Sequence, residues 1–179
     1  MNLENTAMIM VDIQEKLLPA MNQKEEVLDR CVRLLKGVMT LQIPTLVSEQ
    51  YPRGLGETVG ELKKEFRGNV PTISKTSFSC LGQQDMEDWV RGLNREYVLV
   101  CGIEAHICVM QTVLDLQRAG YKPVVISDCV TSRSIRDYTA AIERMRKEGV
   151  IVTTYEAVLF ELLKDLKHPK FKEILAIIK

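Results

Sequence analysis

The stretch from residue 97 to residue 108 reads Tyr97-Val98-Leu99-Val100-Cys101-Gly102-Ile103-Glu104-Ala105-His106-Ile107-Cys108. Its first five residues form a continuous apolar run, which is typical of a strand buried on both faces of a parallel sheet. Gly102 ends the run, and a helical pattern follows from Ala105 to Arg118, with Gly120 as its C-cap. The stretch therefore predicts a strand, a short turn and a helix.

The rest of the chain repeats this alternation of short apolar runs and longer amphipathic segments. The predicted strands cover residues 7–11, 45–47, 70–75, 97–101, 123–126 and 150–153. The predicted helices cover residues 25–41, 57–66, 84–93, 105–118 and 135–148, and two more finish the chain, the last beginning at His168-Pro169. Six strands alternating with helices predict an α/β fold, a three-layer α/β/α sandwich around a six-stranded, mostly parallel sheet. The common strand order is the Rossmann-like 3-2-1-4-5-6, which places strands 1 and 4 side by side.

Length and composition predict a single domain spanning residues 1–179. A chain of 179 residues is near the usual size of one domain, and 46% hydrophobic residues supply one core. The 24 Lys and Arg residues balance the 24 Asp and Glu residues, whereas nucleic-acid binders usually carry a basic excess. No apolar run approaches the roughly 20 residues of a membrane helix, and the first residues lack the basic start of a signal peptide. We therefore expect no nucleic-acid partner, no membrane contact and a cytoplasmic location.

Chemically capable side chains follow three of the predicted strands. Ligands in open α/β sheets bind beyond the carboxyl ends of the strands. Asp12 follows the first strand, Lys75 ends the third, and Cys108 lies in the first turn of the helix after the fourth. A helix N-terminus favours a thiolate, so the three residues predict a set of nucleophile, base and orienting group. Each also has a structural interpretation: Asp12 as a cap, Lys75 reaching solvent, and Cys108 as a small core residue.

Other sequence features indicate no cofactor and no metal. The five cysteines are an odd number without a CxxC pair, which predicts free thiols. The two histidines, His106 and His168, form no cluster with zinc-ligand spacing. His106 precedes Cys108 by two residues, so the two side chains leave a helix on different sides. The glycines from Gly54 to Gly60 are spaced one residue too widely for a dinucleotide fingerprint.

Three blocks of this sequence resemble the signature blocks of the isochorismatase-like cysteine hydrolases. They are Val11-Asp12-Ile13-Gln14, Lys75-Thr76-Ser77-Phe78-Ser79 and the segment from Gly102 to Val109. The blocks occur in the order of that family, and the resemblance covers essentially the whole chain. The segments from Ser48 to Gly56 and from His168 to Ile174 are similar to the subgroup of isochorismatase domain-containing proteins.

The resemblance implies a catalytic triad of Asp12, Lys75 and Cys108. It also implies a cis peptide bond between Ile103 and Glu104, and an oxyanion hole formed by the backbone N–H groups of Glu104 and Cys108. Nicotinamidases of this family hold a metal with histidines after the second strand, but the segment from residue 49 to 56 has none. True isochorismatases lack the cysteine, so Cys108 argues against hydrolysis of a vinyl ether.

The implied activity is a cysteine-dependent hydrolysis of a small-molecule amide or a related C–N bond through a thioester. Gln14, Tyr51 and Phe78 follow strand ends and either line a substrate pocket or simply pack. The resemblance also implies a homo-oligomer, a dimer or larger. Two other interpretations remain open: a catalytically silent homo-oligomeric interaction module, and a redox-sensing thiol at Cys108 with a lowered pKa.

Overall fold

A computed structural model describes all 179 residues and contains one six-stranded parallel sheet. The sheet has the order β3-β2-β1-β4-β5-β6, and every neighbouring pair is parallel. The strands are β1 (Thr6–Val11), β2 (Thr45–Gln50), β3 (Thr72–Lys75), β4 (Tyr97–Ile103), β5 (Lys122–Thr131) and β6 (Ile151–Thr153). The predicted fold class and strand order are confirmed.

Eight α-helices and three short turns of other helical types connect the strands. The α-helices are α1 (Lys24–Thr40), α2 (Pro52–Leu55), α3 (Gly60–Lys63), α4 (Gln84–Leu93), α5 (Met110–Arg118), α6 (Ile135–Lys147), α7 (Tyr155–Leu163) and α8 (Phe171–Ile178). Two 3-10 turns cover Leu18–Ala20 and Cys80–Gly82, and a π-helical turn covers Ala105–Val109. None of these helices combines the length and the apolar character needed to cross a membrane.

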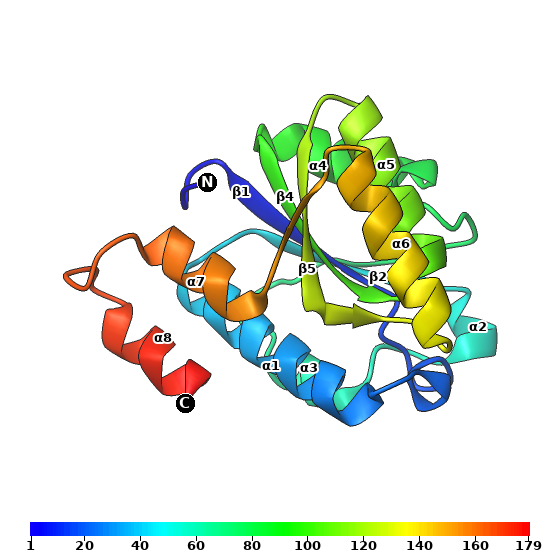
Figure 1. Cartoon of the computed structure of the whole chain (residues 1–179), viewed down its shortest axis with the longest axis horizontal. Coiled ribbons are helices and arrows are strands. Elements are labelled where there is room, and N and C mark those ends of the chain that lie inside the picture. Colours follow the sequence, from blue (N-terminus) through cyan, green and yellow to red (C-terminus); the bar gives the residue numbers. More distant parts are fainter.

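The helices cover both faces of the sheet (Figure 1). Helices α1, α3, α7 and α8 contribute to one core cluster, and α4, α5 and α6 contribute to the other. Strand β1 supplies both clusters because successive side chains of a strand point to opposite faces. Met8 and Met10 lie in the first cluster, and Ile9 and Val11 lie in the second. This two-sided burial explains why the strands read as continuous apolar runs.

Three strands are longer than their sequence pattern predicts, and the first of them, β2, continues past Val47 to Gln50. Gly102 does not end β4, which continues to Ile103, and β5 continues past Ser127 to Thr131. The register between β4 and β5 shifts between Val100 and Gly102, so the pairing resumes beyond the shift. Gly102 has φ +123°, and a Cβ there would lie 2.0 Å from the carbonyl oxygen of Val11. Only glycine permits this close approach of β4 to β1.

Three predicted helix boundaries are wrong. The final helix begins at Phe171 rather than at His168-Pro169, because the residues before it form a turn closed by the Phe171 N–H on the His168 carbonyl. The predicted helix 57–66 shrinks to α3, and the segment before it contains α2. The predicted helix 105–118 begins as a π-helical turn, which continues as α5 only from Met110.

Candidate active site

The parallel sheet brings Asp12 and Lys75 together at its carboxyl edge. Asp12 directly follows β1 and has φ +52°, and Lys75 is the last residue of β3. The Lys75 Nζ lies 2.7 Å from Oδ2 of Asp12, and both side chains are completely buried. A buried charge is costly unless it is paired and hydrogen-bonded, so this pairing offsets part of the cost of burying both side chains.

Two side chains of β2 complete the contacts of this ion pair. The Ser48 hydroxyl donates to Oδ1 of Asp12 at 2.6 Å. The Gln50 Oε1 atom accepts a hydrogen bond from Lys75 Nζ at 2.7 Å, and the Gln50 amide nitrogen donates to the carbonyl of Thr76. Both carboxylate oxygens of Asp12 therefore have a donor. Sequence reasoning missed Ser48 and Gln50, although their i, i+2 spacing in a strand places them on the same face of the sheet.

Backbone carbonyls take up the remaining hydrogen-bonding capacity of Lys75. Its ammonium group lies 3.0 Å from the carbonyl oxygen of Phe78 and 3.3 Å from that of Ser77. Four oxygen atoms thus surround Nζ in a site that excludes water. This arrangement fixes the ammonium group beside Asp12 and also fastens the loop after β3 to the sheet.

Cys108 lies in the π-helical turn that follows β4, and only 7% of its surface is exposed. The pKa of its thiol is raised to about 12, first by burial and then by the negative charge of Asp12, against the opposing charge of Lys75. The expectation that a helix N-terminus favours the thiolate is therefore wrong for the resting protein. Local helix position omits burial, which is the largest cause of the shift, and the neighbouring carboxylate, which also favours the neutral thiol.

The backbone before Cys108 places an amide group at the sheet edge. The peptide bond between Ile103 and Glu104 is cis. The N–H of Glu104 donates no hydrogen bond within the chain, and the N–H of Cys108 has no partner outside its own turn. The Glu104 side chain instead accepts hydrogen bonds from the backbone N–H and the guanidinium group of Arg133 at 3.0 and 3.2 Å.

The three predicted pocket residues lie in different environments. Gln14 is completely buried, its amide nitrogen donates to the carbonyls of Gln50 and Gly56, and its Oε1 accepts from the Gln50 N–H. Tyr51 and Phe78 are 57% and 53% exposed. A hollow of about 350 Å³ lies at this edge, lined by Tyr51, Pro52, Arg53, Ser74, Lys75, Thr76 and Gln83. The hollow has the size of a small-molecule site.

The two histidines form hydrogen bonds elsewhere in the chain, whereas a further thiol, that of Cys80, lies near the ion pair. The Nδ1 atom of His106 lies 2.9 Å from the Ser132 hydroxyl, and His168 accepts from the backbone of Lys170. Cys80 is buried close to the ion pair, and burial and the charge of Asp12 raise its pKa. No three His, Cys, Asp or Glu side chains are arranged as a metal site.

A family model described as "Isochorismatase domain" matches residues 6–157. The chain belongs to the isochorismatase family. The match includes Asp12, Lys75 and Cys108, so the cluster at the carboxyl edge lies inside the family domain.

Relatives in this hydrolase family match nearly the whole chain. Isochorismatase domain-containing protein 1 of Salmo salar is 39% identical over 174 residues, which cover 97% of this chain and 61% of the relative. The chain thus spans less than two thirds of the length of that relative. The structure titled MAR1 ribonuclease from Caenorhabditis elegans has a TM-score of 0.95 and 39% identity, covering 99% of this chain and 91% of that one.

A more distant solved structure shares the fold. The YcaC gene product of Escherichia coli, described as an octameric hydrolase of unknown specificity, has a TM-score of 0.89 and 20% identity. The alignment covers 98% of this chain and 94% of that chain. The isochorismatase-family fold therefore persists where few residues are identical.

Proposed function

We propose that this isochorismatase-family chain is a cysteine-dependent hydrolase that cleaves a small-molecule amide or a related C–N bond. The observation that carries the proposal is the buried Asp12–Lys75 ion pair beside the neutral thiol of Cys108. A neutral thiol needs a base at the moment of attack, and Asp12 is the carboxylate whose charge acts on this thiol. Asp12, Lys75 and Cys108 are the proposed catalytic residues.

The first half of the proposed reaction forms a thioester. Asp12 takes the thiol proton, and the sulfur forms a bond to the carbonyl carbon of the substrate. Lys75 remains protonated and offsets the charge of the site. The C–N bond then breaks, and Asp12 returns the proton to the leaving amine. Each proton that Asp12 accepts is therefore released within the same half-reaction.

The second half hydrolyses the thioester. Asp12 takes a proton from water, the hydroxide attacks the carbonyl carbon, and the C–S bond breaks. The departing thiolate recovers the proton from Asp12, which restores the neutral thiol. We assign the oxyanion hole to the N–H groups of Glu104 and Cys108, since the Glu104 N–H has no partner in the chain. One such donor is typically worth about 3 kcal/mol of transition-state stabilisation.

The hollow beside Tyr51 and Lys75 is our candidate for substrate entry, with Tyr51 and Phe78 contacting the substrate. Gln14 is buried and bonded to backbone on both sides, so we assign it to holding β2 and the following loop in place. No metal or cofactor takes part in the proposed steps.

A homo-oligomer is part of the proposal. Large apolar side chains are exposed after three strand ends, at Tyr51, Phe78 and Ile135. Exposed apolar groups of this size are typical of interaction surfaces when they lie together. The E. coli neighbour is described as an octamer. Light scattering on the purified chain measures the oligomeric state directly, and a monomer at every concentration contradicts this part of the proposal.

The two alternative functions make different predictions. A redox-sensing thiol needs a lowered pKa, and the raised pKa of Cys108 argues against it. An interaction module has no need for a fully hydrogen-bonded ion pair beside a thiol. The name of the C. elegans neighbour adds RNA as a substrate to be tested on this chain.

A turnover screen tests the proposal. The full chain and Cys108→Ala are given small primary amides, N-carbamoyl compounds, activated esters and a single-stranded RNA oligonucleotide, and release of ammonia, alcohol or RNA fragments is followed. We expect release from at least one amide or N-carbamoyl compound that Cys108→Ala abolishes. Equal turnover by Cys108→Ala, or cleavage of RNA alone, contradicts the proposed reaction. Intact-mass detection of an acyl adduct on Cys108 distinguishes the thioester route.

A further inference from the structure

A second cavity, of about 470 Å³, lies at the opposite edge of the sheet from the Asp12–Lys75 pair. Its wall includes Thr45, the first residue of β2, and Val70, which shortly precedes β3. Because all strands are parallel, these residues mark the amino edge of the sheet. The volume falls within the range of roughly 300–1,000 Å³ that is usual for small-molecule sites.

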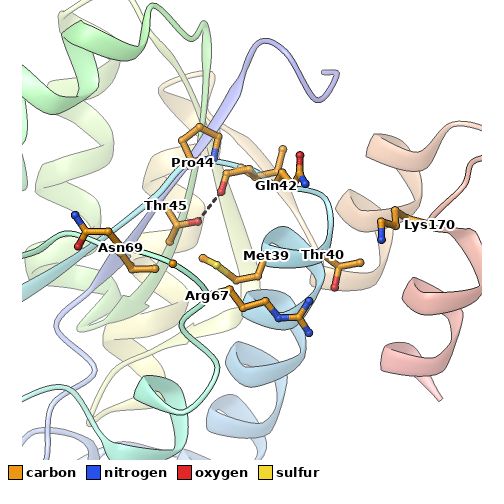
Figure 2. A pocket seen from close by; sticks show the side chains of 11 residues that line it. Met39, Thr40, Gln42, Pro44, Thr45, Arg67, Asn69 and Lys170 are labelled. Carbon is orange, nitrogen blue, oxygen red and sulfur yellow. Dashed lines mark hydrogen bonds between the residues drawn. The ribbon is translucent and has the colours of Figure 1, made fainter.

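Three segments that are distant in sequence meet at this cavity. Thr40 ends α1, Arg67 belongs to the loop before β3, and Lys170 lies in the turn before α8. Figure 2 shows the side chain of Thr40 between the guanidinium group of Arg67 and the side chain of Lys170. Two cationic groups and a hydroxyl thus border the same space.

Several polar groups of this cavity lack partners within the chain. Thr40 is only 6% exposed, yet its hydroxyl makes no hydrogen bond in the protein. Every fully buried side-chain oxygen of the chain has a partner, so the unpaired Thr40 hydroxyl is open to the cavity, where it can donate to a ligand. Arg67 makes no ion pair or side-chain hydrogen bond, and the backbone N–H groups of Gly68 and Asn69 donate none.

The acidic groups nearby in these segments leave the cavity electropositive. Glu65 pairs with Lys36 at 3.5 Å, and Glu173 pairs with Lys170 at 2.8 Å. The Lys170–Glu173 pair is solvent-exposed on both sides, and such pairs are weak. An anionic ligand can therefore compete for Lys170, while Arg67 has no competing carboxylate.

The C-terminal end of α1 does not cancel this positive charge. The last carbonyls of a helix repel anions when they are left open. Here the carbonyls of Gly37, Val38 and Met39 accept the N–H groups of Leu41, Ile43 and Gln42. Gln42 adopts φ +57°, the left-handed conformation of a helix C-cap.

We propose that this cavity binds the phosphate group of a small metabolite. Arg67 and Lys170 supply the charge, and the Thr40 hydroxyl and the free N–H groups of Gly68 and Asn69 supply directed donors. The cavity is larger than a phosphate group, so it also holds an organic part. The site is separate from the proposed catalytic cluster, and the inference does not depend on the hydrolase activity.

Phosphate titrations of the full chain test this inference. Inorganic phosphate and glycerol 3-phosphate are added at constant ionic strength, with sodium chloride as the reference, and the backbone amide NMR signals are followed. We expect saturable shifts at Gly68 and Asn69 and tighter binding of the phosphomonoester. Arg67→Gln should weaken binding at least tenfold, and Thr40→Val should weaken it severalfold. Cys108→Ala should bind like the original chain.

The matched control is Arg136→Gln, which removes an exposed arginine of α6 that makes no ion pair. This variant should leave the affinity unchanged. Shifts that do not saturate, equal affinities for Arg67→Gln and Arg136→Gln, or shifts centred on the carboxyl edge of the sheet overturn the proposal. Arg67 is exposed, so its substitution leaves the fold intact and keeps the test decisive.

Discussion

The Nζ atom of Lys75 reaches Oδ2 of Asp12 across an intervening strand. Asp12 follows β1 and Lys75 ends β3, and β2 lies between these strands. The side chains of Ser48 and Gln50 from β2 contact opposite ends of the ion pair. Three strands therefore contribute to one hydrogen-bonded group, which couples the stability of the sheet edge to the chemistry proposed there.

Removing one member of this ion pair should destabilise the fold. Asp12→Asn leaves Lys75 charged in a fully buried position, and breaking such a pair costs about 3–5 kcal/mol. Urea unfolding of the single variants and of Asp12→Asn/Lys75→Met measures this cost. We expect the double variant to be more stable than Asp12→Asn alone. Additive losses in the double variant would show that the two charges do not depend on each other.

Ser48 should affect turnover through the position and charge of Asp12. Ser48→Ala removes a hydrogen bond to a buried carboxylate, which is worth about 1.5–3 kcal/mol. We expect kcat/KM for the substrate found in the screen to fall roughly tenfold or more. Ser48→Thr retains a hydroxyl and should recover most of the loss; equal effects of both variants would exclude this role.

Alkylation of Cys108 should be slow at neutral pH and should accelerate as the pH rises. The thiol pKa of about 12 means that the thiolate fraction increases about tenfold for each pH unit below that value. Mass spectrometry after iodoacetamide treatment between pH 7 and pH 10 measures the rate at Cys108. Asp12→Asn should increase this rate and Lys75→Met should decrease it, because the two charges shift the pKa in opposite directions. A rate that levels off below pH 8 would contradict the raised pKa.

The buried thiols should make the fold less stable at alkaline pH. Burial is the main cause that raises the pKa of Cys129 to about 11, and the pKa of Cys101 is raised well above its usual value, first because its thiol donates a hydrogen bond to Cys31. In the unfolded chain these thiols titrate near pH 9, so above that pH the unfolded chain loses protons that the native chain keeps. The free energy of unfolding is therefore highest below pH 9. Above pH 9 it falls by up to about 1.4 kcal/mol per pH unit for each thiol.

Urea unfolding at pH 8.5, 9.25 and 10 measures this dependence. Cys129→Ala should be less stable at pH 8.5 because of the lost packing, but its stability should fall less steeply with pH. If the free energy of unfolding fell with pH equally steeply in Cys129→Ala and in the original chain, Cys129 would not be a cause of the pH dependence.

Gly102 should tolerate no side chain. A Cβ at this position would lie 2.0 Å from the Val11 carbonyl oxygen, at a φ that disfavours L-residues. We expect Gly102→Ala to lose more than about 3 kcal/mol or to fail to fold. Gly92→Ala is the matched control, because a Cβ there meets nothing within 4 Å inside α4. That change should stabilise the fold by about 0.5–1 kcal/mol.

The alternation of apolar runs and amphipathic segments predicts most of this fold, because a strand that is buried on both faces of the sheet needs apolar residues throughout. The segments 7–11 and 97–101 were recognisable for that reason, and strand-end logic placed Asp12 beside Lys75. The extension of β5 to Thr131 was not predictable, because it depends on the register shift opposite Gly102. Ser127 and Asp128 interrupt the apolar run although the strand continues through them.

The site was less predictable than the fold, because its properties depend on contacts between strands. Gln50 is a polar residue at the end of a short run, and its contact with Lys75 follows only from the β2–β3 register. The raised pKa of Cys108 follows first from its burial and then from the charge of Asp12, which lies 96 positions earlier in the chain. Local helix position alone gave the opposite sign.

The raised pKa of Cys108 also bears on the durability of the protein. At pH 7 a thiol with a pKa near 12 is ionised in only about one molecule in 10⁵. Peroxides and electrophilic metabolites attack the thiolate rather than the neutral thiol. A sulfur kept in this protonated form resists accidental damage between encounters with substrate, and it becomes a strong nucleophile only while a neighbouring carboxylate holds its proton.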